Sequence, residues 1–322
     1  MQLGVIGTGK IVQEALPVIV QTPGITVRSI WAREHSRERA AELAATYGIP
    51  QVYTDYDALL ADEAVDFVYV ALVNSVHYEY TLRALQAGKN VILEKPACLQ
   101  ASELIHLATE ARRRGLYLFE AVTLLHLPAM HRIMDELIPL IGSIRHVECN
   151  YSQRSSRMDR YLRGDVAPAL DPATGGGALM DINVYNLHFA TALLGAPDEA
   201  RYDCLRGFNG VDLSGTAVMT YREALAVCTG TKDTDAPSFG LVQGEKGWIR
   251  VDGPVSTLQS VTLCLRGKEP SSLPVAPVSH RMAPEFAAFE RIYTQHDLAT
   301  MNRWLDHSIV VMSLLDVLRR RQ

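Results

Sequence analysis

The chain has 322 residues, of which 48% are hydrophobic and 21% charged, and its formal net charge at pH 7 is −5. This length suits one large or two medium domains of an ordinary globular protein. The net negative charge, without a long basic run, argues against nucleic acid as a partner. We expect neither a membrane segment nor a secretory signal, because every apolar run is shorter than about 18 residues and no basic region precedes a hydrophobic one.

The five cysteines lie scattered through the chain, at positions 98, 149, 204, 228 and 264. They form no Cys-x-x-Cys pair and no zinc-binding spacing, so the sequence predicts no metal site. We interpret them as reduced residues of a cytoplasmic protein.

The N-terminal segment reads as strand, glycine loop and helix. Residues 3–6 are typical of a buried strand, and Gly7 and Gly9 follow directly. Gly7 permits a tight turn, and Gly9 lets a pyrophosphate approach the backbone at the positive end of a helix. The third glycine position of this dinucleotide-binding fingerprint holds Val12, so we expect the helix to stand slightly off the strand.

The second expected strand covers residues 25–30. NAD-binding folds usually place a carboxylate at its end to hold the ribose hydroxyls. Here no carboxylate ends the strand, and Arg33 and Arg37 follow it. Both guanidinium groups could clamp a 2′-phosphate. The sequence therefore favours NADP(H), with NAD(H) as the alternative because Glu34 lies between the two arginines.

Strands and helices alternate as far as residue 121. Helices are expected over residues 36–47, with Ser36 as cap and Gly48 as end, from 57, over 78–86 and over 102–115, and strands over 66–71, 91–93 and 116–121. This alternation indicates right-handed βαβ units and a doubly wound parallel sheet. We therefore expect a Rossmann-type dinucleotide-binding domain at residues 1–121.

The strand at residues 91–93 ends abruptly in Glu94-Lys95-Pro96. A lysine there stands at the carboxyl end of a central strand, the edge at which open α/β sheets bind ligands. Pro96 cannot continue the strand, and it restricts Lys95 to extended conformations. The alternative is an ordinary surface lysine, but the surrounding motifs favour a binding site.

Residues 122–322 are expected to form a second domain for substrate binding and oligomerisation, with a C-terminal helix at 301–319 near the domain junction. Strands are predicted at residues 144–152, 200–208, 214–221, 225–231, 239–243, 248–251 and 261–265. Their number and short turns indicate one large, mostly antiparallel open sheet. Its uncovered face predicts a homodimer or a higher homo-oligomer. The long polar stretch at 153–174, which includes Arg154, is expected to be a binding loop.

Three consecutive glycines at 175–177 open a helix that is predicted to run to residue 194. Along it Asp181, Tyr185 and His188 recur at i, i+4 and i+7. This spacing places the three side chains on one helix face. Such a polar stripe is typical of a cleft wall rather than of a core-facing surface.

Together these motifs resemble the glucose–fructose oxidoreductase / inositol dehydrogenase family (Gfo/Idh/MocA). The matching residues are Gly7 and Gly9, Asn74 and His77, Ala84, Ala87, Gly88 and Lys89, Glu94-Lys95-Pro96, and Asp181 with Tyr185. Tyr185 is similar to the residue in the dihydrodiol dehydrogenase and glucose–fructose oxidoreductase branches. The resemblance implies a Rossmann domain, a C-terminal α/β domain on a large open sheet, and a Lys–Pro bond that is commonly cis.

The resemblance also implies a set of site residues, which adds to the arginines above. The expected cofactor-binding residues are Gly7, Thr8, Gly9, Lys10, Ile11, Arg33, Arg37, Leu72, Asn74, His77, Glu94 and Lys95, and the weaker substrate-binding ones are His188, His126 and Arg154. The chain departs from the family pattern at Val73, where proline is usual, and at Asn183, where glycine is usual. These departures leave the substrate open.

The motifs predict hydride transfer between a nicotinamide and a secondary alcohol or carbonyl of a sugar, polyol or dihydrodiol-like molecule. Tyrosine has a pKa of about 10, and a lysine cation about 4 Å away could lower it by up to roughly three units. We therefore expect Tyr185 as general acid/base, Lys95 as its electrostatic tuner, and Asp181 as orienter of substrate or lysine. Lys95 or His188 are the alternative proton carriers.

Two other functions fit the same motifs. One is a non-catalytic sensor or regulator that binds the dinucleotide, and the other is a redox-neutral enzyme with a tightly held cofactor. A sensor would need neither Lys95 nor Tyr185, so their presence favours the oxidoreductase.

Overall fold

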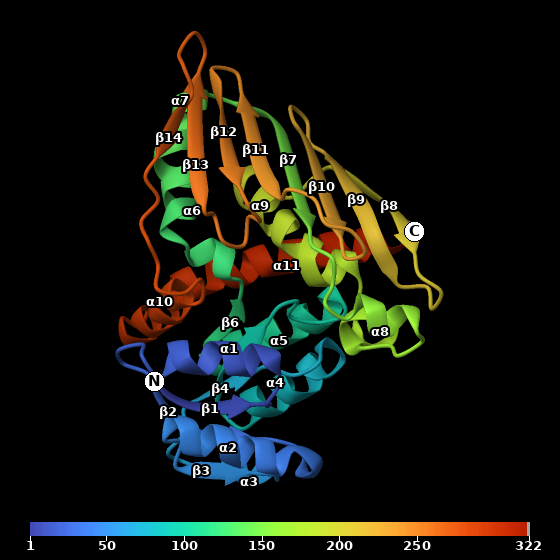
Figure 1. Cartoon of the computed structure of the whole chain (residues 1–322). Helices are drawn as coiled ribbons and strands as arrows, with labels where there is room; N and C mark the ends of the chain where they lie inside the picture. The colour runs from blue at the N-terminus through green and yellow to red at the C-terminus, as the bar shows by residue number, and fades with distance from the viewer. Residues whose placement is uncertain (321–322) are drawn as a thin grey trace. The chain divides into compact units, whose positions relative to one another are not determined.

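The computed structural model describes residues 1–320, which divide into two compact units (Figure 1). The first comprises Met1–Ala121 together with Met282–Ile309, and the second comprises Val122–Arg281 and the chain from Val310 on. The division after residue 121 coincides with the expected domain boundary. Residues 282–309, which we expected in the second domain, group with the first unit instead.

The first unit contains a six-stranded parallel sheet in the order β3-β2-β1-β4-β5-β6, so the prediction of a doubly wound parallel sheet is confirmed. Every residue of the central strands β4 and β5 is buried, as expected for strands covered on both faces. The strands are β1 (Gln2–Ile6), β2 (Thr26–Trp31), β3 (Gln51–Tyr53), β4 (Phe67–Val70), β5 (Asn90–Glu94) and β6 (Leu118–Ala121).

The helices of this unit follow the strands in alternation. They are α1 (Lys10–Ile19), η1 (Glu34–Ser36), α2 (Arg37–Tyr47), α3 (Tyr56–Ala61), η2 (Asn74–Val76), α4 (His77–Gln86), α5 (Ala101–Arg114) and α10 (Ala283–Thr294), and α11 (Leu298–Arg320) begins here. Gly48 ends α2 in the left-handed conformation, as predicted. Ser36 is the N-cap residue of α2, as expected, but its side chain makes no capping hydrogen bond in the described chain, and the η1 turn directly precedes α2.

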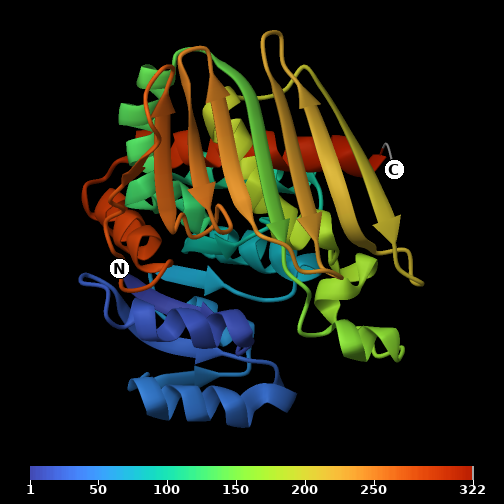
Figure 2. The ribbon, with the colours of Figure 1, turned by 45° about the horizontal axis from the view of Figure 1, so that its top comes forward.

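The second unit contains an eight-stranded sheet in the order β14-β13-β12-β11-β7-β10-β9-β8 (Figure 2). Among the described strands of this second sheet, only β7 and β10 pair in parallel, so the predicted large, mostly antiparallel sheet is confirmed. The strands are β7 (Ile144–Ser152), β8 (Glu199–Arg206), β9 (Asp212–Thr220), β10 (Leu225–Thr231), β11 (Phe239–Gly244), β12 (Gly247–Asp252), β13 (Ser260–Leu265) and β14 (Ser271–Leu273).

The helical segments of the second unit are short. They are η3 (Thr123–His126), α6 (Pro128–Arg132), η4 (Ile133–Leu137), α7 (Ile138–Ile141), α8 (Met158–Leu162), η5 (Pro168–Leu170), η6 (Pro172–Thr174), η7 (Leu179–Asn183) and α9 (Val184–Leu194). The helix expected to run regularly to residue 194 begins with the π-helical turn η7, which contains Asp181. The predicted loop at 153–174 contains α8 and two 3₁₀ turns.

A glycine lets the π-helical turn approach the sheet closely. A Cβ on Gly230 of β10 would lie 2.7 Å from Cβ of Asn183, so a larger residue would push η7 away. The Asn183 amide donates to the carbonyl of Cys228 at 2.9 Å, and the Asn186 amide donates to Thr229 at 2.9 Å. The start of α9 is therefore fixed against β10. No helix within residues 1–320 is both long and apolar enough to cross a lipid bilayer.

Candidate active site

The glycine loop leaves an uncovered helix start. Gly7 has φ 120°, and a Cβ there would lie 2.6 Å from the carbonyl oxygen of Ala71, so the turn requires glycine. Gly9 is the N-cap of α1, and nothing lies within 4 Å of the position its Cβ would take. No side chain of residues 1–320 caps α1, and its first turn contains no acidic residue. Its first N–H groups can therefore receive a phosphate.

The neighbouring residues complete this loop. The Gln13 amide donates to the carbonyl of Thr8 at 3.0 Å, which braces the loop from the helix. Lys10 is exposed and Ile11 is half-buried in the first turn, whereas Val12 is fully buried. The branched side chain at the third fingerprint position therefore belongs to the core of the unit.

Arg33, Glu34 and Arg37 follow β2 and are all exposed. Glu34 and Arg37 form an ion pair at 3.6 Å with side chains that are 72% and 67% exposed. Such a pair holds its partners only weakly. The guanidinium of Arg33 has no ion pair or hydrogen-bond partner among the described residues. Both arginines can therefore turn toward an anionic group near the end of β2.

The turn after β5 is held by buried side chains that bind its main chain. The Lys95–Pro96 peptide bond is cis, as the resemblance implied, and the Lys95 side chain is half-buried. The Glu120 carboxylate accepts a hydrogen bond from the Ala97 N–H at 2.8 Å. The Glu94 carboxylate accepts from the Lys95 N–H at 3.2 Å and from the Tyr69 hydroxyl at 2.5 Å. The backbone on both sides of the lysine is thus fixed.

His77 is another support of the same turn. Its Nδ1 lies 3.0 Å from the carbonyl oxygen of Pro96, and its Nε2 lies 3.1 Å from that of Leu72. The ring is fully buried, and burial lowers the pKa of His77, so it is neutral and donates to one carbonyl at a time. We expected His77 to contact the cofactor. Its position instead joins the residues after β4, including the half-buried Leu72 and Asn74, to the lysine turn.

Glu120 has an unusual environment for a carboxyl group. It is 8% exposed, and burial raises the pKa of Glu120 to about 7, with the charge of Glu94 adding to this increase. The Ser308 hydroxyl, the Ala97 N–H and the charge of Lys95 oppose the shift but do not cancel it. A proton can therefore enter or leave this group near neutral pH.

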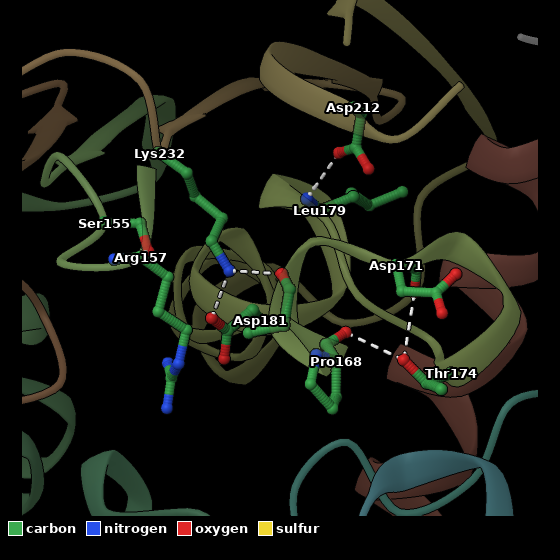
Figure 3. Close-up of polar contacts among 10 residues, drawn as sticks. Ser155, Arg157, Pro168, Asp171, Thr174, Leu179, Asp181, Asp212 and Lys232 are labelled. Atoms are coloured by element: carbon green, nitrogen blue, oxygen red, sulfur yellow. Dashed lines mark hydrogen bonds and ion pairs between the residues drawn. The ribbon is translucent and has the colours of Figure 1, made fainter. Parts of the chain in front are cut away.

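In the second unit, Asp181 is paired with a lysine that the sequence analysis did not select. The ammonium of Lys232 donates to Asp181 Oδ2 at 2.5 Å and to the carbonyl oxygen of Ala169 at 2.7 Å (Figure 3). The Lys232 side chain is 3% exposed, whereas that of Asp181 is 36% exposed. The carboxylate is thus fixed from the interior and accessible from outside.

A second carboxylate fixes the helix start. Asp212 accepts from the Leu179 N–H at 2.7 Å (Figure 3). It also accepts from the Tyr202 hydroxyl at 2.7 Å. A Cβ on Gly177 would lie 1.9 Å from Asp212 Oδ1, so the last glycine of the 175–177 run gives this carboxylate its place. Asp212 and Lys232 therefore hold η7 through different atoms.

Tyr185 and His188 lie deeper than the predicted polar stripe implies. Tyr185 is 7% exposed and its ring centroid lies 6.2 Å from that of Tyr151, while His188 is 1% exposed. The π-helical turn changes the spacing between Asp181 and the α-helical positions that follow it. The expectation of one accessible polar face therefore fits Asp181 but is wrong for His188.

The other two weak predictions differ in burial, because His126 is buried and Arg154 is partly exposed. His126 is 4% exposed at the end of η3. Arg154 pairs with Asp159 at 2.7 Å on the surface. The structure does not gather His126, Arg154 and His188 into one accessible group. Within residues 1–320, no cluster of His, Cys, Asp or Glu could hold a metal ion.

Comparison with known proteins identifies the family. Residues 1–122 match the GFO_IDH_MocA model, described as an oxidoreductase family with an NAD-binding Rossmann fold, and residues 139–250 match the GFO/IDH/MocA C-terminal domain. The chain is 30% identical over 296 residues to the uncharacterized oxidoreductase YgjR of Escherichia coli, covering 92% of this chain and 89% of that protein. The chain belongs to the GFO/IDH/MocA oxidoreductase family.

Two further relatives are similar along almost their full length. The scyllo-inositol 2-dehydrogenase (NADP(+)) IolU of Bacillus subtilis is 26% identical, covering 100% of this chain and 97% of that protein. The 3-ketoreductase KijD10 of Actinomadura kijaniata, solved with NADP and TDP-benzene, is 29% identical with a TM-score of 0.87, covering 99% of this chain and 97% of that one. As a member of this family, the protein is an NAD(P)-dependent oxidoreductase.

The residues present fit the nicotinamide dinucleotide that this family uses. Gly9 has open space where a Cβ would lie, and the start of α1 is uncapped among the described residues. The exposed Arg33 follows β2, which pairs in parallel with β1, the strand before the glycine loop. The chain thus offers N–H groups for a pyrophosphate and a cation for a further phosphate.

The sequence analysis missed three side chains that fix the site: Tyr69, Glu120 and Lys232. Glu120 could have been noticed in the sequence, because it lies within the otherwise apolar strand Leu118–Ala121. A glutamate is rarely buried in a strand unless it has a specific partner. Lys232 carried only a weak signal, as a charged residue directly after β10. Tyr69 carried none, because tyrosine is common in buried strands.

Proposed function

We propose that the protein transfers a hydride between NADP(H) and a secondary alcohol or carbonyl carbon of a sugar, polyol or dihydrodiol-like small molecule. The main observation behind this proposal is that buried side chains hold the main chain of the turn at Lys95–Pro96, the lysine turn. His77, Glu94 and Glu120 are all buried, and each hydrogen-bonds the main chain beside Lys95. A lysine that served only solubility would need no such support. A fixed cation is suited to stabilising negative charge that develops on a substrate oxygen.

The preference for NADP(H) over NAD(H) is supported by the end of β2. Arg33 and Arg37 are exposed there, and the strand lacks the terminal carboxylate that would hold ribose hydroxyls. A 2′-phosphate would add charge-assisted hydrogen bonds to guanidinium groups. The relatives IolU and KijD10 carry NADP in their names or structures, which agrees with this assignment.

The bound dinucleotide supplies or accepts the hydride at the substrate carbon. In the direction of carbonyl reduction, the π electron pair of the C=O bond moves to oxygen as the C–H bond forms. Tyr185 donates its hydroxyl proton to that oxygen, and in the opposite direction the tyrosinate takes the proton back. Lys95 favours the tyrosinate and the developing alkoxide by its charge. Asp181 orients the substrate by accepting from a neighbouring hydroxyl.

The substrate class is proposed from the relatives and from the polar groups of the second unit. IolU is named for an inositol, and KijD10 is a 3-ketoreductase solved with a TDP derivative. The first name describes a ring rich in hydroxyls and the second a ketone, and the accessible carboxylate of Asp181 would accept hydrogen bonds from ring hydroxyls. The panel for a substrate screen is therefore inositols, aldoses, trans-dihydrodiols and nucleotide-activated keto-sugars.

The first experiment is calorimetric titration of nucleotide-free protein with NADPH and, separately, NADH, followed by the screen in both directions. Tighter binding of NADPH and turnover of one panel compound would support the proposal. Tighter binding of NADH would overturn the arginine clamp and direct attention to Glu34. Binding without turnover would favour a sensor, and nucleotide retained through purification with redox-neutral conversion would favour the third function.

We also propose that the outer face of the second sheet joins two copies of the chain. On β11 and β12 the side chains alternate, with Val242 and Ile249 buried and Leu241 and Trp248 half-exposed. A hollow of about 590 Å³ with Leu241 and Trp248 in its lining lies on this face. Apolar residues on an open sheet face suit an interface between identical subunits. Light scattering of Trp248→Glu should show a smaller particle than the wild type, and an unchanged mass would contradict this assembly.

A further inference from the structure

Lys232 lies directly after β10 and connects several segments of the second unit. Its ammonium donates to Asp181 and to the carbonyl of Ala169. Its backbone N–H donates to the carbonyl of Leu213 at 2.7 Å, and its carbonyl accepts from the Ser155 N–H at 2.7 Å. The main chain and the side chain of one residue thus join β9, β10, the residues after β7, η5 and η7.

The pair of Lys232 and Asp181 is not explained by stability alone. Taking an ammonium out of water is unfavourable unless it is paired and hydrogen-bonded, and here the carboxylate and one carbonyl supply those partners. Buried ion pairs can often be replaced by apolar residues with no loss of stability. A lysine at this position, 3% exposed, therefore suggests a use for the charge itself.

The exposure of the pair is one-sided. The cation is enclosed, whereas the carboxylate is 36% exposed. Because Oδ2 of Asp181 is bound from the interior, the direction of the whole carboxylate is set. The same ammonium holds Ala169 in the 153–174 segment, which we expected to line the substrate site. The carboxylate and this segment therefore share one anchor (Figure 3).

We propose that Lys232 is a positioning residue of the substrate site, which keeps Asp181 correctly directed and couples it to η5. This inference rests on the proposed function, in which Asp181 orients the substrate. It adds a residue of the second unit that acts through Asp181 and does not touch the reacting atoms.

The test compares Lys232→Met with the wild type on the NADPH-bound full-length protein, using the compound that the screen identifies. We expect kcat/KM for that compound to fall by about tenfold to 100-fold, as for other supports of site residues, while the Kd for NADPH stays within about twofold. Lys232→Arg should recover part of the loss.

A matched control is available in the first unit. Lys89 is also buried, at 9% exposed, and its ammonium donates to the carbonyls of Asp62 and Val65 at 2.8 and 2.6 Å without a paired carboxylate. Lys89→Met should lower thermal stability and leave kcat/KM unchanged below the unfolding temperature. If Lys232→Met behaves like this control, with a loss of stability alone, the proposal is wrong.

The double variant Asp181→Asn/Lys232→Met covers the case in which Lys232→Met does not fold. It removes both charges, so no unpaired ion is left buried. Because Lys232 acts through Asp181, the double variant should be no less active than Asp181→Asn alone. A further tenfold loss in the double variant would overturn the proposal.

Hydrogen exchange separates this inference from the proposed function. The amides of Leu170 and Asp171 donate within η5 and report on that turn. Asp181→Asn should speed their exchange when Lys232 is present and have no effect in the Lys232→Met background. If the wild type turns over no panel compound, the proposed function fails, and this cycle still tests the coupling. Additive effects in the cycle would show that Lys232 does not link Asp181 to η5.

Discussion

Glu120 in the first unit and Asp181 in the second are both carboxylates that accept hydrogen bonds, yet their donors differ in charge. Glu120 accepts hydrogen bonds from the Ala97 N–H and the Ser308 hydroxyl, which are neutral. Asp181 accepts from the ammonium of Lys232. Burial raises the pKa of Glu120 to about 7, so its charge is poised to change near neutral pH.

Because their donors differ, the two carboxylates should serve different purposes in the two units. The lysine turn of the first unit contains a group that gains or loses a proton near physiological pH, so its electrostatics should vary with pH. In the second unit, the ammonium of Lys232 pairs with the carboxylate of Asp181 and fixes its direction. Amino-acid substitutions in each unit can test this contrast.

The largest expected effect comes from Tyr185→Phe, which asks whether the second unit also carries the proton. The substitution removes the hydroxyl and keeps the ring that contacts Tyr151. We expect kcat to fall by about 10²–10⁴, the usual contribution of a positioned acid or base. Steady-state kinetics at saturating NADPH would measure the loss.

The control for Tyr185→Phe is Tyr221→Phe, a tyrosine of the same unit whose hydroxyl donates to the carbonyl of Gly195. This variant should keep kcat within about twofold, because Gly195 follows the C-terminal end of α9, whereas Tyr185 lies in its first turn. A near-wild-type rate for Tyr185→Phe would move the proton to Lys95 or His188. The second unit would then orient the substrate through Asp181 without taking part in proton transfer.

The next effect is on stability, from Glu120→Gln in the first unit. The folded-state pKa of Glu120, about 7, lies above its ordinary value of 4.5. The folded protein therefore binds one more proton than the unfolded chain between these values, and stability falls as pH rises through this window. The loss reaches about 3 kcal/mol above pH 7 as an order of magnitude.

Glutamine keeps an acceptor for the Ala97 N–H but does not titrate, so Glu120→Gln should remove this pH dependence. We expect the variant to be more stable than the wild type at about pH 8 by up to roughly 3 kcal/mol, and to lose this advantage near pH 5. Urea unfolding at both pH values would measure it. Parallel pH dependences in the two proteins would show that Glu120 stays ionised or protonated throughout.

The contrast between the units also explains what the sequence could predict. The parallel sheet and the lysine turn follow from local patterns: apolar runs of four to six residues, a glycine after the first strand, and Pro96 after Lys95. The second sheet follows from repeated short strands, although β14 was missed because it has three residues, all of them partly or fully exposed. Helix α10 was missed despite the spacing of Phe286 and Phe289.

The contacts that fix Asp181 could not be read in the same way. Lys232 follows it by 51 residues, and the two meet only because η7 packs on β10. The π-helical turn also shifts Asp181 relative to Tyr185 and His188, and a regular 3.6-residue period cannot anticipate that. A buried pair of opposite charges depends on the tertiary fold, whereas a strand-end turn depends on neighbours in sequence.

A smaller effect is expected at the end of β2, where the charges are exposed. Arg33→Gln and Arg37→Gln should each raise the Kd for NADPH by about tenfold, because each removes a charged donor to a phosphate. The Kd for NADH, which lacks that phosphate, should change by less than about twofold. Calorimetric titration with both nucleotides would measure this, and equal losses for NADPH and NADH would contradict the clamp.

The smallest effect should come from Glu34→Gln, which breaks an ion pair that is the exposed counterpart of the pair in the second unit. Glu34 and Arg37 are 3.6 Å apart and both more than two-thirds exposed. Water and salt screen such a pair, so its loss should leave thermal stability nearly unchanged, unlike the loss of either charge from the buried pair.

Removing Glu34 frees Arg37 and should tighten NADPH binding by about twofold to threefold, an effect that added salt should reduce. Weaker NADPH binding by Glu34→Gln would instead mean that the carboxylate contacts the nucleotide itself, and the assignment of this strand end to a 2′-phosphate would then be wrong.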